Sequence, residues 1–317
     1  MDSVSRRGAL LQAALLGGAS EAVLRRGAAA TATRIVDAHV HFYDPSRPQG
    51  VPWPAPSETI LYRTTYPARY LESVQPLAVD GVVVVEASPW LEDNLWLLRL
   101  GDDHRLIMGV VGNIPPGHPD FRAAVGRFSR HPLFRGIRVG SGSLPRLLDN
   151  AQMFADLKFL AGSDLALDVL LSGQPAFDAI ARLSGALPDL RIVLGHLPIA
   201  SPAGETARSK FQEGLRGLTR CTRVYGKVSG VARRVGGQVP ADASFYKPAL
   251  DELWEIFGPE RVIYASNWPV SDLVAPYATI FRLVRDYLAA RDQETVDRFF
   301  WKNSLAAYKW RERSPKA

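Results

Sequence analysis

Eight short apolar segments recur along the chain, and stretches with helical periodicity separate them. The segments comprise residues 34–40, 81–86, 106–111, 134–139, 165–171, 191–196, 223–229 and 261–267. Each one is short and rich in apolar residues, which is typical of a strand buried on both faces. Residues 81–86 are the least ambiguous, since their β-branched run is continuous and too short for a helix. Strands that alternate with helices pair in parallel through right-handed crossovers. The pattern therefore predicts a (β/α)8 barrel, a distorted TIM barrel in a single domain.

The expected helix boundaries support this fold. Pro175 and Pro276 stand where helices are predicted to begin, and Gly162 and Gly258 follow where helices end. Proline at the start and glycine just past the end are the usual helix signals. A final helix is predicted over residues 294–310. The main competing fold, an open doubly wound sheet, usually has fewer strands and a G-x-G-x-x-G turn after the first, which this chain lacks.

The first 32 residues have the pattern of an export signal. Arg6 and Arg7 precede a short apolar stretch over residues 9–19, and residues 30–32 form an Ala-Thr-Ala cleavage site. Paired arginines in this setting indicate the twin-arginine route, which predicts a periplasmic or secreted barrel over residues 33–317. The alternative is a frayed amphipathic helix on a cytoplasmic protein.

If export depends on Arg6 and Arg7, replacing both by lysine is expected to trap the precursor inside the cell. Normal periplasmic accumulation of this variant would contradict the dependence on the arginine pair.

Composition excludes several classes of partner and site. The 38 Lys and Arg residues against 32 Asp and Glu give a net charge of +6, but the charge is spread along the chain. No basic run of the nucleic-acid-binding type is present. The apolar stretch near the N-terminus is too short for a stable membrane anchor. Cys221 is the only cysteine, which excludes an internal disulfide and a zinc ribbon. A small-molecule substrate is therefore expected, with the oligomeric state left open.

Two histidines stand two residues apart at the end of the first predicted strand. Because side chains at i and i+2 point to the same side of a strand, His39 and His41 are expected to lie together. Such a pair can ligate one metal ion or share proton transfer. Asp37 lies on the same side and is predicted to orient one of the rings. The alternative is a pair of satisfied polar residues at the start of a loop.

Other chemically active side chains also fall at predicted strand ends, where a barrel places its active site. Glu86 ends the second strand, Arg138 the fourth and His196 the sixth, while Asn267 closes the eighth. The Arg138 guanidinium is a natural fork for a substrate carboxylate. Lys227 lies within the apolar seventh strand, where it either reaches the substrate or forms a structural ion pair.

The region after the first strand also bears on the site. Residues 42–70 are rich in Pro, Trp and Tyr and are too long for a simple turn between strand and helix. They are predicted to fold over the mouth of the barrel.

Asp168 lies on the fifth strand. It is a buried acid with either a structural or a functional role.

Four motifs together resemble the amidohydrolase-2 family, and most closely its lactonase-like branch, which includes sugar-lactone and pyrone-dicarboxylate lactonases. The motifs are Asp-Ala-His-Val-His at 37–41, Phe-Arg-Gly-Ile-Arg-Val at 134–139, Val-Leu-Gly-His at 193–196 and Ala-Ser-Asn-Trp-Pro-Val at 265–270. The resemblance spans roughly residues 34–310. It implies a distorted TIM barrel that hydrolyses a lactone or a related ester or amide.

The resemblance also implies roles for individual residues. His39 and His41 correspond to the histidine pair of the first strand, and His196 to the histidine of the sixth. Arg138 and Lys227 become candidate cations that contact the substrate, and Trp268 a third candidate for substrate binding.

Two departures from the family pattern weaken a metal centre. The family usually has aspartate at the end of the eighth strand, where this chain has Asn267, and metal-dependent relatives carry a histidine on the fifth strand, which residues 165–171 lack. An amide is uncharged and cannot take a proton from water. The expected cofactor is therefore none or one divalent metal, Zn²⁺ or Mn²⁺, held if bound by His39, His41 and Glu86.

The reaction expected from these residues is attack of water on a lactone carbonyl. His39, His41 or His196 acts as the general base, and Arg138, Lys227 and the Asn267 amide donate toward the developing charge. One alternative is a catalytically reduced barrel that binds a carboxylated or sugar-like ligand. Another is a decarboxylase or hydratase, since the fold alone does not determine the chemistry.

Overall fold

Eight parallel strands form the centre of the protein. The computed structural model describes residues 33–171, 176–198 and 204–313. The strands are β1 (Val36–Val40), β2 (Gly81–Val85), β3 (Ile107–Gly112), β4 (Phe134–Gly140), β5 (Ala166–Leu170), β6 (Ile192–Pro198), β7 (Val224–Ser229) and β8 (Val262–Tyr264). They form one sheet in chain order, with every neighbouring pair parallel. All eight predicted strands are confirmed, although β8 ends at Tyr264 rather than at residue 267.

The sheet closes on itself through the segment that follows β8. Val40 and Trp268 form a parallel bridge, His41 N donates to Trp268 O at 2.8 Å, and Asn267 N donates to His39 O at 2.9 Å. These bonds join the end of β1 to residues beyond β8. Because β8 itself has only three residues, the closure is irregular, and the predicted distorted TIM barrel is confirmed.

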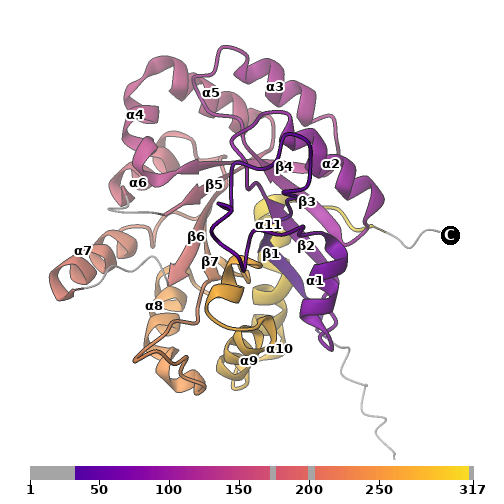
Figure 1. Cartoon of the computed structure of the whole chain (residues 1–317). Coiled ribbons are helices and arrows are strands. Elements are labelled where there is room, and N and C mark those ends of the chain that lie inside the picture. Colours follow the sequence, from indigo (N-terminus) through magenta and orange to yellow (C-terminus); the bar gives the residue numbers. More distant parts are fainter. Residues whose placement is uncertain (1–32, 172–175, 199–203, 314–317) are drawn as a thin grey trace, which may run out of the picture. The chain divides into compact units, whose positions relative to one another are not determined.

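Helices connect the strands and surround the barrel (Figure 1). They are α1 (Pro67–Val74), α2 (Asp93–Asp103), α3 (Phe121–Phe128), α4 (Leu144–Asp149), α5 (Ala151–Gly162), α6 (Phe177–Ala186), α7 (Glu205–Arg216), α8 (Lys247–Phe257) and α9 (Tyr277–Leu288). The chain then forms α10 (Gln293–Asp297), a π-helical stretch and α11 (Asn303–Tyr308). The predicted final helix therefore exists but ends at Tyr308, because Lys309 adopts a left-handed conformation.

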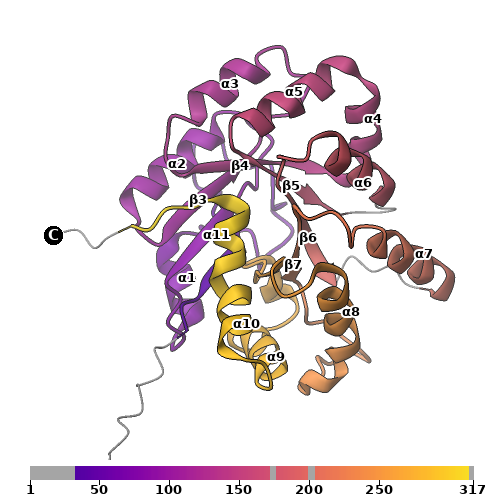
Figure 2. The same ribbon diagram turned by 180° about the vertical axis from the view of Figure 1, so that it is seen from behind.

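The two ends of the barrel are covered by different parts of the chain. The indigo loop between β1 and α1 crosses the front of the barrel in Figure 1, as predicted for this region, although α1 already begins at Pro67. In Figure 2, seen from behind, α11 crosses the opposite end. Tyr308 and Trp310 pack there with the apolar side chains of the barrel interior. The C-terminal segment thus closes the floor and leaves the front of the barrel for a site.

The predicted export signal lies outside the described residues, as do Pro175 and its expected helix start. Within the part of the chain that is described, no helix is both long and apolar enough to cross a membrane.

Candidate active site

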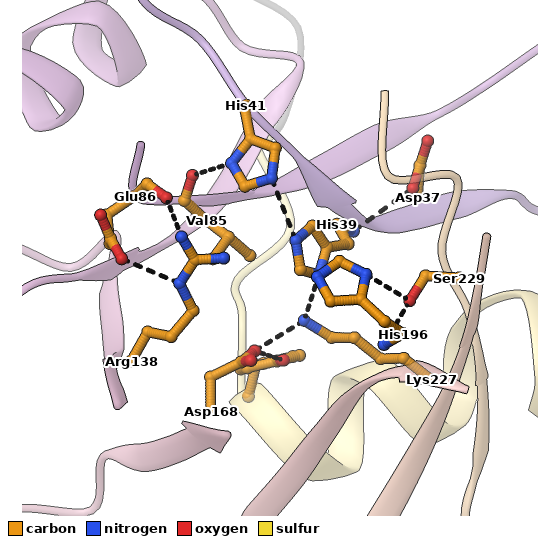
Figure 3. A network of polar contacts seen from close by, with 11 residues as sticks. Asp37, His39, His41, Val85, Glu86, Arg138, Asp168, His196, Lys227 and Ser229 are labelled. Carbon is orange, nitrogen blue, oxygen red and sulfur yellow. Dashed lines mark hydrogen bonds and ion pairs between the residues drawn. The ribbon is translucent and has the colours of Figure 1, made fainter. Parts of the chain in front are cut away.

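A cavity of about 420 Å³ opens at the carboxyl ends of the strands. Its polar and aromatic lining comes from strands or loops far apart in the sequence and includes His41, Trp53, Ser88, Glu86, Asn113, Arg138, His196 and Asn267. Five of the side chains predicted from the sequence therefore meet at one place, as the barrel geometry requires. Figure 3 shows how the charged and imidazole groups of this region face one another.

His39 in β1 and His41 just after it form a fixed pair. His41 Nδ1 lies 2.9 Å from the Val85 carbonyl oxygen, and the Nε2 atoms of His39 and His41 are 3.2 Å apart. A carbonyl oxygen only accepts, so Nδ1 of His41 carries the hydrogen and Nε2 of the neutral ring has a lone pair. His41 lines the cavity, whereas His39 is completely buried behind it.

A buried ion pair supports His39 from below. Lys227 Nζ donates to Asp168 Oδ2 at 2.6 Å and lies 3.3 Å from His39 Nδ1. Tyr308 OH, from the barrel floor, donates to the same carboxylate oxygen at 2.6 Å. The side chains of Lys227 and Asp168 are completely buried. With the Lys227 ammonium as donor, His39 Nδ1 accepts, and His39 Nε2–H points toward the lone pair of His41.

All three histidines of the site are neutral at pH 7. Burial lowers the pKa of His41 to about 3 and that of His196 to about 4, with the Arg138 cation acting in the same direction. Burial, aided by the Lys227 cation, lowers the pKa of His39 well below its usual value. The rings are therefore lone-pair acceptors and N–H donors rather than cations.

His196 and Asn267 occupy unusual backbone positions at the mouth. Their φ angles are +66° and +61°, in the left-handed region that non-glycine residues rarely adopt. His196 N donates to Ser229 Oγ at 2.7 Å, and the same hydroxyl lies 3.4 Å from His196 Nδ1. The Asn267 Oδ1 atom is buried and has no hydrogen-bond partner among the described residues. An unsatisfied acceptor in a cavity can accept a hydrogen bond from a water molecule or from the substrate.

Arg138 and Glu86 bind each other. Arg138 Nε donates to Glu86 Oε1 and Arg138 Nη2 to the Glu86 carbonyl oxygen, both at 2.8 Å. The guanidinium therefore donates two hydrogen bonds within the protein. It is not the free group, available to a substrate carboxylate, that the sequence suggested. Both residues of the pair still line the cavity.

Two of the residues predicted to contact the substrate do not line the cavity. Lys227 and Trp268 are completely buried, and neither lines the cavity. Trp268 instead packs against Phe42 and Tyr70 beneath the mouth. The aromatic ring at the cavity is Trp53, from the covering loop, whose ring centroid is 5.9 Å from that of His41. The aromatic content of the loop was a signal for such a residue, but it did not distinguish Trp53 from its neighbours.

Asp37 does not orient an imidazole ring, contrary to the prediction. Its Oδ1 accepts the backbone N–H groups of His39 and Ser266, and its Oδ2 accepts the hydroxyls of Tyr70 and Tyr277 at 3.0 and 3.2 Å. Burial raises the pKa of Asp37. The carboxylate thus holds the backbone at the end of β1 against the segment after β8, and it positions His39 and Asn267 through the main chain.

The donor set does not fit a divalent metal centre. The rings of His39, His41 and His196 lie side by side, but in the described part of the chain no three His, Cys, Asp or Glu side chains are placed so that they could hold a metal ion. The proposed third ligand, Glu86, is held by Arg138, and the end of β8 supplies a neutral amide. A structural zinc site needs four ligands and a catalytic one usually three from the protein. The predicted ligand set of His39, His41 and Glu86 is therefore not assembled.

Comparison with known proteins identifies the family. The amidohydrolase family model matches residues 36–310. The chain is 30% identical to an L-fucono-1,5-lactonase of Burkholderia ambifaria, over 86% of this chain and 91% of the relative.

Among solved structures, an amidohydrolase of Burkholderia multivorans with bound zinc has a TM-score of 0.76 at 22% identity, covering 88% of this chain and all of its own. A 5-carboxyvanillate decarboxylase of Novosphingobium aromaticivorans with manganese has a TM-score of 0.62 at 17% identity, covering 88% of this chain and 97% of its own. Both show the same fold, and structures related to this one therefore bind Zn²⁺ or Mn²⁺. From the family match and the lactonase relative, the chain belongs to the amidohydrolase family.

Proposed function

We propose that the protein hydrolyses a sugar lactone or a related cyclic ester by attack of water on the ring carbonyl. The observation that carries this proposal is the placement of a neutral, fixed imidazole, His41, at a cavity that also presents the unsatisfied oxygen of Asn267. A lactonase relative at 30% identity supports the same reaction class. Trp53 adds an aromatic face of the kind on which sugar rings pack.

Each residue has a part in this mechanism. The Asn267 oxygen accepts one hydrogen of the attacking water. His41 Nε2 exchanges its hydrogen bond from His39 Nε2–H for the water and takes a proton from it. The Ser229 hydroxyl accepts the backbone N–H of His196, and in the tautomer that this mechanism uses it donates its own hydrogen to His196 Nδ1. His196 Nε2–H is then a donor toward the developing oxyanion or the departing alkoxide.

This chemistry suits an activated ester. General-base assistance contributes about 10²–10⁴-fold, and an imidazole with a strongly lowered pKa is a weak base. A strained lactone needs no more than this, whereas an unactivated amide does. The incomplete donor set around His39 and His41 supports a reaction that uses no metal.

The pH dependence follows from the lowered imidazole pKa values. The base must be unprotonated, so after subtraction of the uncatalysed reaction kcat/KM is expected to be level between about pH 6 and pH 8 and to fall only near pH 4. Asn267→Asp places a carboxylate beside the rings, stabilises their protonated forms and is expected to move the acidic limb to higher pH. A wild-type limb near the ordinary histidine value of about 6.5 would contradict the assignment.

A panel of sugar and aromatic lactones with a pH indicator tests the function. Ring opening releases an acid, so hydrolysis of L-fucono-1,5-lactone or a similar sugar lactone is expected to acidify the solution. Failure to hydrolyse any lactone would contradict the proposal. Tight binding of a lactone without turnover would instead favour a reduced, ligand-binding barrel, and release of CO₂ from an aromatic acid would favour a decarboxylase.

A further inference from the structure

The active-site cavity continues into a second one on the side of β3 and β4. The second cavity has a volume of about 280 Å³. It shares Glu86, Asn113, Arg138 and Leu170 with the first, so the two are parts of one groove. A six-carbon lactone seated at His41 occupies only the first part. The groove therefore has room for a substituent that extends from the lactone ring.

The positively charged side chain that lines both cavities already has a counter-charge within the protein. Arg138 is bound to Glu86 by a side-chain and a main-chain hydrogen bond, so its charge is matched within the protein. An anionic substituent that reaches past this pair needs a different cation.

Arg146 is that cation. It lies on α4 and lines the second cavity, it is exposed, and it forms no ion pair with any carboxylate of the described residues. The other lining residues of this part are mostly apolar and include Pro115, Pro116, Val139 and Leu147. A channel lined by both polar and apolar groups, with an unpaired guanidinium in its wall, suits a substrate extension that ends in a carboxylate.

The backbone beside Arg146 leaves this channel open. Gly140 lines the second cavity, and a Cβ atom added there would meet no atom within 4 Å. The Ser143 hydroxyl donates to the Gly140 carbonyl oxygen at 2.7 Å and fixes the turn. Gly140 has φ −79° and ψ 142°, a conformation open to any residue, so a side chain can be placed in the channel without backbone strain.

We infer that this second cavity is a substrate subsite and that the natural substrate is a lactone with a carboxylate-bearing extension, bound by Arg146. The inference rests on the proposed lactone hydrolysis. An acidic sugar attached to an aldonolactone has this chemistry, since its ring is a spacer with apolar faces and its carboxylate matches the guanidinium fork.

A matched pair of disaccharide lactones tests the inference. The two differ only in whether the outer sugar is glucose or glucuronic acid, and the parent monosaccharide lactone is the reference. In the wild type, KM is expected to be about tenfold lower for the glucuronic acid compound than for the glucose compound. Arg146→Ala is expected to abolish this difference and Arg146→Lys to retain part of it, because an ammonium lacks the planar fork.

Two further variants test separately whether the charge of Arg146 and the width of the channel determine KM. Arg130→Ala removes another exposed, unpaired arginine that lines neither cavity, and it is expected to leave the tenfold difference intact. Gly140→Val narrows the channel and is expected to raise KM for both disaccharide lactones relative to the parent. The inference is overturned if the parent is hydrolysed while wild-type KM is the same for both disaccharides, or if the difference survives in Arg146→Ala. If no lactone is hydrolysed at all, the proposed function itself fails.

Discussion

Replacing His41 by alanine is expected to lower kcat for lactone hydrolysis by about 10²–10⁴-fold with little change in KM. The reason is that His41 carries the lone pair at the cavity, fixed by its bond to the Val85 carbonyl. The change removes an interaction made with the attacking water rather than with the bound lactone, so the loss falls on kcat. Steady-state kinetics on a sugar lactone measure the effect.

Two controls keep this result interpretable. His131→Ala removes a partly exposed imidazole that pairs with Asp102 away from the cavity, and it is expected to leave kcat unchanged. Circular dichroism is expected to show the same fold for both variants. His39→Ala is also expected to abolish turnover, but part of its effect comes from the space left beside Lys227. A His41→Ala enzyme with the wild-type rate would show that the site is assigned wrongly.

Replacing Lys227 by methionine is expected to lower the free energy of unfolding by about 3–5 kcal/mol. Lys227 and Asp168 are both completely buried, and removal of the ammonium leaves the carboxylate without its counter-charge. Chemical denaturation measures the loss as a lower midpoint at an unchanged slope.

The double variant Lys227→Met with Asp168→Asn tests the cause. The amide keeps an acceptor for the Tyr308 hydroxyl but carries no charge, so the double variant is expected to be more stable than Lys227→Met alone. Lys247→Met breaks an exposed pair with Asp251 and is expected to cost less than about 1 kcal/mol. Equal stability of Lys227→Met and the wild type would contradict the view that the ion pair supports the floor of the site.

The barrel could be predicted because its signals are local. The strands are short and rich in apolar residues, most clearly in Gly81–Val85, where burial on both faces favours apolar residues at every position. The position of the site followed from the same pattern, since parallel strands bring their carboxyl ends together. His41, His196 and Asn267 accordingly meet at one cavity.

The direction of individual side chains could not be predicted in the same way. The alternation of side chains along a strand shows which residues share one side of it. It does not show how deep those residues lie, and Lys227 and His39 both prove to be fully buried. Nor does the sequence show that Glu86 would occupy the Arg138 guanidinium. Trp53 rather than Trp268 lines the cavity because of tertiary packing, which no local pattern records.

We propose that the polar side chains of this site hydrolyse a lactone without a metal ion. The most direct test compares the rate of sugar-lactone hydrolysis by wild-type protein before and after exhaustive treatment with EDTA. The metal content is measured in both samples. We expect equal rates in the two samples and no increase when Zn²⁺ or Mn²⁺ is added. Complete loss of turnover on chelation, restored by Zn²⁺, would contradict it and would make Glu86, released from Arg138, the third ligand beside His39 and His41.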